Sequence, residues 1–275
     1  MNRTTVFLGD SHTCGYDSIP GKIGPGSYSM WNDNNYAELY GLAHNRQTAI
    51  YAVPGSCNRI YPDWLKSMFE RYPDTDEVFV CLSAWNRFIL AYNKMLSTDV
   101  LPVDYFTKKV SEKHNGLVHI YQDELYKEDR FQLFNKPHQG DFKTIPGAGF
   151  DKDHALIDPD IRKDNFMKVK LFFDLNTHLE QRDFFKDIYL MDRMCTDNAC
   201  SLYLFNMTDR MKFPDSFEFY GKLKSTVVAP LTVESYFRKK MIDHTKHYTS
   251  DNEHYNHYYH SLIAGDYLEW LKEDC

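Results

Sequence analysis

The sequence predicts an α/β fold, a three-layer α/β/α sandwich built on a parallel sheet. Two observations predict it. Short apolar runs rich in β-branched residues recur along the chain, and turn-forming or polar residues end them abruptly, as is typical of buried parallel strands. Segments with apolar residues at helical spacing separate these runs, and strands that alternate with helices favour a parallel sheet.

The first two strands are expected close to the N-terminus. Thr4–Leu8 is an apolar run that stops at Gly9-Asp10-Ser11, a sequence typical of turns. Apolar residues at helical spacing around Tyr36–Leu42 predict a helix, and Thr48–Val53 then predicts a second strand that ends at Pro54-Gly55. The first strand therefore leads directly into a polar turn.

A further helix and strand complete the first third of the chain. Trp64, Met68 and Phe69 have helical spacing, and Val78–Leu82 is a third apolar strand that stops at Ser83. The first third of the chain thus contains three predicted strands separated by helical segments, which is the pattern expected of a parallel α/β sheet.

The middle of the chain changes in character. Residues 101–159 carry many charges and are punctuated by Pro, Gly and His, so we interpret them as an insertion on the core fold. Because long loops at such edges usually carry specificity, the insertion is expected to shape or cover the site. The whole chain, residues 1–275, is then a single domain.

The remaining elements follow this insertion. Apolar residues from Phe166 onward predict a long amphipathic helix that continues towards Met194, with its apolar stripe in the core. Ser201–Met207 is expected to form a fourth strand, and a final helix is expected from near His254 to Leu271.

The composition is that of a folded protein with an acidic balance. The 275 residues are 43% hydrophobic and 16% aromatic, which is enough for a large buried core. A net charge of -7 without a clustered basic face argues against a nucleic-acid partner. No apolar stretch is long enough to cross a bilayer, and the N-terminus lacks the pattern of a secretory signal, so we expect a cytoplasmic protein without a membrane partner.

The six cysteines lack the paired short spacings of a structural zinc site. Reduced thiols are therefore expected, with a disulfide between Cys195 and Cys200 as the alternative.

Two short motifs near opposite ends of the chain carry the groups of a nucleophilic serine site. Ser11 lies where a strand ends, at the edge where open α/β sheets place their sites, although Gly, Asp and Ser also form ordinary turns and helix caps. Asp251 precedes His254 by three residues, so one tight turn could join the carboxylate to the imidazole. Asp251 would then orient His254, and His254 would take the proton from Ser11.

These motifs resemble the SGNH/GDSL hydrolase family, in which an N-terminal Gly-Asp-Ser block is completed by a C-terminal Asp-x-x-His block. The resemblance continues after His254, where the family often has an Asn, a second His and an apolar helix. The corresponding positions here are Asn256, His260 and Leu262-Ile263-Ala264. The compact variant of the block pattern, without a leader segment, resembles phage-type members.

Two intermediate blocks extend the resemblance. Residues 52–58 look like the glycine block of the family, and residues 83–87 lie where its asparagine block should be. The resemblance covers the core but not residues 101–159, and it implies a flavodoxin-like α/β/α sandwich with a serine nucleophile.

The resemblance also implies an oxyanion hole. Its donors would be the backbone amides of Ser11 and Gly55 and the side chain of Asn86. The sequence departs from the family here, because Trp85 stands at the asparagine position and Asn86 follows one place later. Asn58 is the alternative donor, and its other interpretation is a polar residue at a helix start.

Other polar and aromatic residues have two interpretations. Arg87 and Arg59 lie where they could contact an anionic or sugar substrate, and surface solvation explains them equally well. Trp85 would suit stacking on a sugar, although core packing is the default interpretation of such aromatic residues. Histidines three or four residues apart could suggest a metal site, but no carboxylate or cysteine completes an obvious ligand set, so no metal and no cofactor are expected. These histidines are His244, His247, His254, His257 and His260.

The resemblance implies a serine esterase that removes O-acyl groups, acetyl above all, from a carbohydrate or a similar small ester. The alternative is a weakly active or inactive member that serves as a structural or glycan-binding component of a larger assembly, such as a virion. Trp85 at the asparagine position favours this alternative, whereas the intact Ser11 and Asp251–His254 motifs oppose it. A metal-dependent hydrolase is the third hypothesis, and the sequence assigns no oligomeric state.

Overall fold

We describe the chain from a computed structural model. The residues that it describes are 3–13, 15, 17–18, 28–29, 35–52, 58, 61–82, 88–91, 106–110, 118–122, 142–145, 182–209, 217–247 and 254–273.

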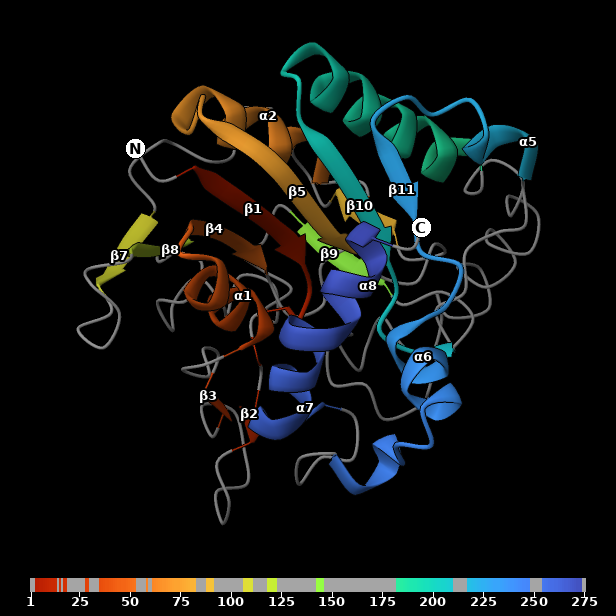
Figure 1. The fold of residues 1–275 in the computed structure, drawn as a ribbon. Helices are drawn as coiled ribbons and strands as arrows, with labels where there is room; N and C mark the ends of the chain where they lie inside the picture. Colours follow the sequence, from red (N-terminus) through yellow and green to blue (C-terminus); the bar gives the residue numbers. More distant parts are fainter. Residues whose placement is uncertain are drawn as a thin grey trace, which may run out of the picture.

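A seven-stranded sheet forms the centre of the protein, in the order β11-β10-β5-β1-β4-β8-β7 (Figure 1). The neighbouring pairs from β11 to β8 are parallel, and β7 is antiparallel to β8. The strands are β1 (Thr4–Gly9), β4 (Gln47–Ala52), β5 (Thr75–Cys81), β7 (Phe106–Val110), β8 (Val118–Gln122), β10 (Ser201–Phe205) and β11 (Thr226–Val228).

The four strands expected from the sequence are β1, β4, β5 and β10. All six residues of β1 are buried, because the strand is paired on both sides and covered on both faces. Numbered along the chain, the order β4-β1-β5-β10-β11 is 2-1-3-4-5, the flavodoxin-like order in which ligands bind outside the carboxyl ends of the strands. The predicted parallel α/β fold is confirmed.

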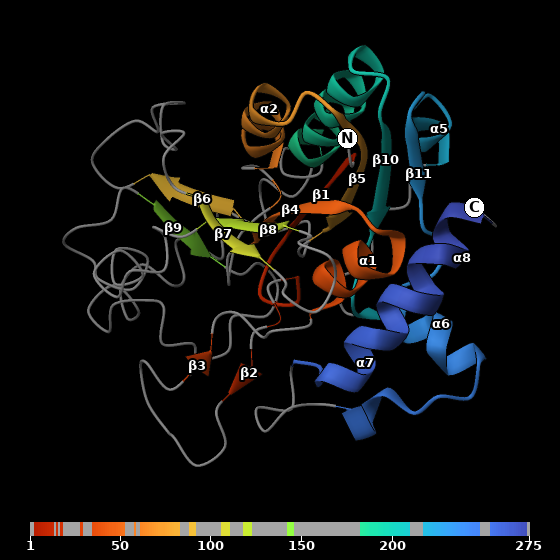
Figure 2. The same cartoon turned by 60° about the vertical axis from the view of Figure 1, so that its left-hand side comes forward.

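Side chains alternate between the two faces of the sheet. Phe7 of β1 packs on one side with α1 and the C-terminal helices, whereas Val6 and Leu8 pack on the other with α2 and the helix over 182–197. Figure 2 shows these two helical layers on either side of the strands. The helices of the first layer are α1 (Tyr36–His44), α6 (Val233–Lys239), α7 (His257–Leu262) and α8 (Leu268–Glu273), and α2 is Tyr61–Arg71.

The final helical segment is continuous from α7 to α8. A π-helical turn, η5 (Ile263–Tyr267), joins the two α-helices and buries Ile263 and Tyr267 in the same core as Phe7. The segment spans the length expected from the sequence. Two shorter helices, α5 (Phe217–Tyr220) and the 3-10 turn η4 (His244–His247), flank β11 and α6 along the chain.

Part of the predicted insertion contributes to the main sheet. β8 pairs in parallel with β4, and β7 extends the sheet beyond it. Two small antiparallel sheets lie outside the main one and pair β2 (Asp17–Ser18) with β3 (Tyr28–Ser29), and β6 (Phe88–Ala91) with β9 (Phe142–Ile145). The single-domain assignment of residues 1–275, with 101–159 as an insertion, stays a prediction.

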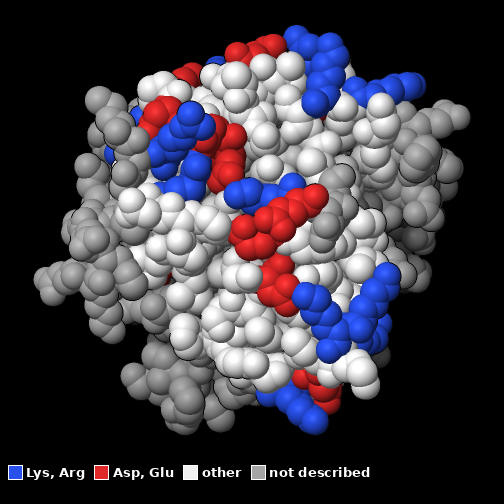
Figure 3. Space-filling view, viewed as in Figure 1, with Lys and Arg blue, Asp and Glu red and all other residues white. Residues whose placement is uncertain are grey.

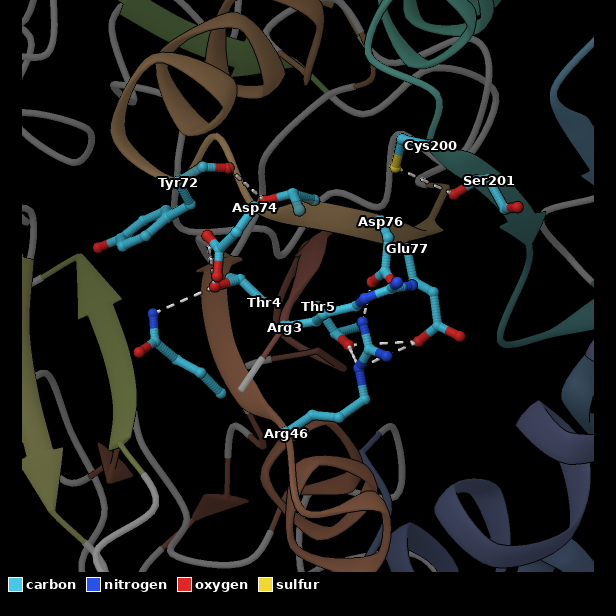
Figure 4. A network of polar contacts seen from close by, with 12 residues as sticks. Arg3, Thr4, Thr5, Arg46, Tyr72, Asp74, Asp76, Glu77, Cys200 and Ser201 are labelled. Carbon is cyan, nitrogen blue, oxygen red and sulfur yellow. Dashed lines mark hydrogen bonds and ion pairs between the residues drawn. The ribbon is translucent and has the colours of Figure 1, made fainter. Parts of the chain in front are cut away.

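A network of charged side chains lies at the amino ends of the central strands (Figure 4). Arg46 forms ion pairs with Asp76 and Glu77, and its Nε atom donates to the Oγ1 atom of Thr5 at 2.6 Å. Arg3 pairs with the other carboxylate oxygen of Asp76 at 2.7 Å. These contacts connect β1, β5 and the residue before β4 at the amino ends of the strands. Ser11 lies at the opposite end, because it follows the carboxyl end of β1.

Opposite charges are interleaved on the face drawn in Figure 3. Lys240 pairs with Asp266 at 2.6 Å, and Arg238 pairs with Asp209 at 2.9 Å.

No helix within the described ranges is both long and apolar enough to cross a membrane. Cys81, Cys195 and Cys200 are buried free thiols.

Candidate active site

Ser11 lies in a tight turn at the carboxyl end of β1. The backbone N–H of Thr13 donates to the carbonyl of Asp10 at 3.0 Å, and the backbone N–H of His12 donates to the carboxylate of Asp10 at 3.1 Å. Asp10 is buried, whereas Ser11 is half-buried. The turn therefore holds the serine at the edge where parallel α/β sheets bind ligands.

The turn requires a glycine at position 9. A Cβ atom on Gly9 would lie 1.8 Å from the Oγ1 atom of Thr13, which is a severe overlap. Thr13 is buried, and its Oγ1 atom hydrogen-bonds the hydroxyl of Tyr36 at 2.7 Å, so it is held where it is. The absence of a side chain at Gly9 thus lets the chain return closely after Ser11.

The structure brings Ser11 and His254 together. The Nε2 atom of His254 lies 2.7 Å from the Oγ atom of Ser11, which is hydrogen-bond distance. His254 is 9% exposed and immediately precedes Tyr255 and the cap of α7. A neutral imidazole in this position can accept the serine proton, as a general base must.

His12 packs against His254. The two ring centroids are 5.0 Å apart, and the ring of His12 also lies 5.8 Å from that of Tyr255. His12 is buried, so the imidazole of His254 is bordered by a second imidazole rather than by solvent on this side. Our sequence reasoning missed His12, although its place directly after Ser11 was a signal that could have identified it.

His260 anchors the C-terminal helical segment to α1. Its Nδ1 atom accepts a hydrogen bond from the backbone N–H of Tyr36 at 3.3 Å, and its ring stacks on the ring of Tyr36. Burial, followed by the nearness of His12, His257 and His254, lowers the pKa of His260 to about 3. It therefore stays neutral near pH 7, as a packed and hydrogen-bonded histidine.

Two other histidines of the suggested cluster have separate surroundings. The Nε2 atom of His244 lies 3.9 Å from a carboxylate oxygen of Glu234, and the ring of His247 packs on Tyr258 and Tyr259. Within the described part of the chain, no group of three or more His, Cys, Asp or Glu side chains is arranged to hold a metal ion.

The hydroxyl and thiol groups beneath the serine turn are protonated. Burial raises the pKa of the Tyr36 hydroxyl and the pKa of the Cys81 thiol. Cys81 is the last residue of β5. Both groups lie near Asp10 and Thr13, and each interacts with the Thr13 hydroxyl. The base of the turn is thus a buried set of polar groups that fixes its shape.

Several predicted site residues lie outside the described residues. They are Asp251, Gly55, Trp85, Asn86, Arg87 and Arg59. Asn58, the alternative oxyanion donor, is described and is 4% exposed. It lies between β4 and α2, on the connection that leaves β4 beside the end of β1, since Ala52 pairs with Gly9.

Comparisons with known proteins give only distant likenesses. No family model matches the sequence, and no curated protein matches it. The psychrotrophic esterase EstA from Pseudoalteromonas sp., in a structure inhibited by monoethylphosphonate, has a TM-score of 0.45 and 9% identity over 99% of this chain and 98% of that chain.

A second solved structure is of a carbohydrate esterase whose active site is described as having divergent catalytic and non-catalytic binding functions. Its TM-score is 0.43 at 12% identity over 98% of this chain, which spans only 65% of that chain's length.

Proposed function

We propose that this protein is a serine esterase in which Ser11 is the nucleophile and His254 is the general base. The observation that carries the proposal is the 2.7 Å contact between the Oγ atom of Ser11 and the Nε2 atom of His254. It joins a turn at the carboxyl edge of the sheet to a residue 243 positions away, which local turn or capping preferences do not explain.

The proposed reaction proceeds in two steps. As the Ser11 Oγ atom attacks the ester carbonyl, His254 takes the hydroxyl proton and then gives it to the departing alcohol, which leaves an acyl-enzyme. His254 next takes a proton from water as the water oxygen attacks the acyl carbon. The bond from this carbon to the Ser11 Oγ atom then breaks, the carboxylic acid leaves, and His254 returns the proton to Ser11. General-base assistance of this kind contributes roughly a hundredfold to ten-thousandfold in rate.

The other residues of the proposed machinery come from the sequence. We assign Asp251 to orient His254, and the backbone amides of Ser11 and Gly55 with the side chain of Asn86 to stabilise the oxyanion. Asn58 is the alternative to Asn86. The burial of Asn58 is as compatible with a fixed oxyanion donor as with a structural role.

The proposed substrate is an O-acyl ester, acetyl above all, of a carbohydrate or a similar small alcohol. This substrate class is implied by the resemblance to the SGNH/GDSL family, and fold alone does not fix it. Trp85 and Arg87 are the proposed substrate contacts, through stacking on a sugar ring and through hydrogen bonding.

The test is hydrolysis of p-nitrophenyl acetate and of an acetylated glycan by folded wild-type protein and by Ser11→Ala and His254→Ala. We expect Ser11→Ala to fall to background and His254→Ala to lose about a hundredfold or more in kcat. Ser261→Ala and His257→Ala are matched controls, because both residues are exposed in the described structure and lie close to His254 along the chain.

Three results would contradict the proposal. A folded but inert wild-type protein would favour the non-catalytic, glycan-binding role in a larger assembly. Full activity in Ser11→Ala would exclude Ser11 as the nucleophile. Loss of activity on treatment with a chelator would favour the metal-dependent alternative, whereas we expect the chelator to have no effect.

A further inference from the structure

Glu234 is a buried carboxylate close to the residue that follows His254. It lies in the first turn of α6 and is 6% exposed. The backbone N–H groups of Val233 and Glu234 donate to the carbonyls of Asn206 and Met207 at 3.0 and 3.2 Å, so the start of α6 is fixed to the chain leaving β10. The Oε2 atom of Glu234 also accepts the backbone N–H of Asp209 at 2.9 Å.

The other carboxylate oxygen of Glu234 holds Tyr255. The Tyr255 hydroxyl donates to the Oε1 atom of Glu234 at 2.6 Å in a buried hydrogen bond. Hydrogen bonds to a charged acceptor are shorter and stronger than those between neutral groups. Tyr255 is 1% exposed, and its ring stacks on Tyr259 of α7 at 4.2 Å.

Tyr255 is connected to the imidazole of His254 in two ways. It is the next residue along the chain, and the backbone N–H of Asn256 donates to the carbonyl of His247 at 2.7 Å, which restrains this segment from the other side. In addition, the ring of His12 lies 5.8 Å from that of Tyr255 and 5.0 Å from that of His254. A shift of the Tyr255 ring would therefore disturb both the backbone and the ring neighbours of His254.

We infer that Glu234 and Tyr255 form a positioning pair that holds the His254 imidazole against Ser11, a role that rests on the proposed esterase function. Rate is sensitive to such placement, because an error of about 1 Å in a reacting group can cost on the order of a hundredfold. His244 also faces this carboxylate, with its Nε2 atom 3.9 Å from the Oε1 atom of Glu234.

The test begins with Tyr255→Phe, which removes the hydroxyl and keeps the ring, and with Glu234→Gln. Using p-nitrophenyl acetate, we expect each variant to lower kcat about tenfold while KM stays within about twofold, since an interaction used in the transition state is lost. The double variant should be no worse than the more impaired single variant, because both substitutions act on the same hydrogen bond. Tyr255→Phe removes its donor, and Glu234→Gln removes the charge of its acceptor.

A cycle with His254→Ala separates positioning from general structural support. If Tyr255 acts through His254, Tyr255→Phe should leave the residual rate of His254→Ala unchanged. Tyr236→Phe is the matched control, because Tyr236 is also a buried tyrosine whose hydroxyl donates to a carboxylate, that of Asp266 at 2.8 Å. We expect this control to keep wild-type kcat.

The outcomes distinguish this inference from the proposed function. An active wild-type protein with unchanged kcat in Tyr255→Phe would overturn the positioning role alone. An equal loss of rate in the wild-type and His254→Ala backgrounds would show that Tyr255 only supports the structure, which also overturns it. A folded but inert wild-type protein would overturn the proposed function and the positioning role together.

Discussion

The Nε2 atom of His254 lies 2.7 Å from the Oγ atom of Ser11, although 243 positions separate the two residues along the chain. The parallel sheet makes this contact possible. Ser11 follows the central strand β1, and the C-terminal helices α7 and α8 pack on one face of the same sheet.

The serine turn should not tolerate a side chain at position 9. In Gly9→Ala the new Cβ would overlap with the Oγ1 atom of Thr13 at 1.8 Å, so we expect a loss of about 3 kcal/mol in the free energy of unfolding. We also expect kcat to fall roughly tenfold or more, because Ser11 would move. Urea unfolding and the rate with p-nitrophenyl acetate measure the two effects.

Gly265→Ala provides the control for this substitution. A Cβ on Gly265 would meet nothing within 4 Å, so the free energy of unfolding should stay within about 1 kcal/mol of the wild-type value. Equal losses in Gly9→Ala and Gly265→Ala would contradict the role assigned to the turn.

His260 should make stability depend on pH. Its pKa is lowered from 6.5 to about 3 in the folded chain, so between these values the unfolded chain binds a proton that the folded chain does not. The stability that this group contributes is therefore complete above about pH 6.5 and decreases as the pH falls towards 3, by about 1.4 kcal/mol for each pH unit.

Urea unfolding at pH 7.5 and pH 5 measures this dependence. Between these values we expect the wild-type protein to lose about 2 kcal/mol more than His260→Gln, because glutamine does not titrate. Glutamine also offers an oxygen that can accept the backbone N–H of Tyr36. Equal losses in the two proteins would mean that His260 is protonated in the folded state.

Asp192 should stabilise the edge of the sheet without affecting catalysis. Its buried carboxylate accepts the backbone N–H groups of Lys224 and Ser225 and the hydroxyl of Thr226, which together hold the start of β11. Asp192→Ala would leave these donors without their acceptor, so we expect the free energy of unfolding to fall by about 3 kcal/mol.

The matched control is Asp197→Asn, an exposed acid on the same helix, which should cost less than about 0.5 kcal/mol. The kcat of folded Asp192→Ala should remain at the wild-type level. A large fall in kcat, with little change in stability, would mean that Asp192 acts on the site instead.

Asp251 should be needed for catalysis if it orients His254. We expect Asp251→Asn to lower kcat by about a hundredfold to ten-thousandfold, because an amide favours the wrong imidazole tautomer. Asp243→Asn, at an exposed acid before η4, should keep full activity. Steady-state kinetics with p-nitrophenyl acetate decides between the two expectations, and an active Asp251→Asn would remove Asp251 from the proposed site.

Local patterns were sufficient to predict the central strands. β1, β4 and β5 are apolar runs ended by turn-forming or polar residues, and this pattern is visible without any tertiary information. β10 ends earlier than expected, at Phe205, because the carbonyls of Asn206 and Met207 instead accept hydrogen bonds from the start of α6. Such boundaries depend on contacts that are distant in sequence.

Other elements could not be found from local patterns. β11 has only three residues, all half-buried, which is too short for a periodicity to be recognised. β7 and β8 lie within the charge-rich segment 101–159. β8 itself carries no Asp, Glu, Lys or Arg, but the charged residues along the rest of this segment hid its pairing with β4.

The candidate site divides in the same way. Ser11 and His254 could be predicted as site residues because each lies in a short motif with a recognised chemistry. Glu234 lies in no such motif, and His12 directly follows the serine motif but has no assigned role in it. Glu234 is an ordinary acidic residue in the first turn of a helix. Hydrogen bonds between the start of α6 and the chain that follows β10 fix the position from which it contacts Tyr255.

Covalent labelling with a fluorophosphonate, read by intact mass and by peptide mapping, tests the central claim most directly. We expect one adduct on Ser11 of the folded wild-type protein, none on Ser11→Ala, and a rate at least about a hundredfold lower in His254→Ala. No adduct on the wild-type protein, or an undiminished adduct on Ser11→Ala, would contradict the assignment of Ser11 as a nucleophile activated by His254.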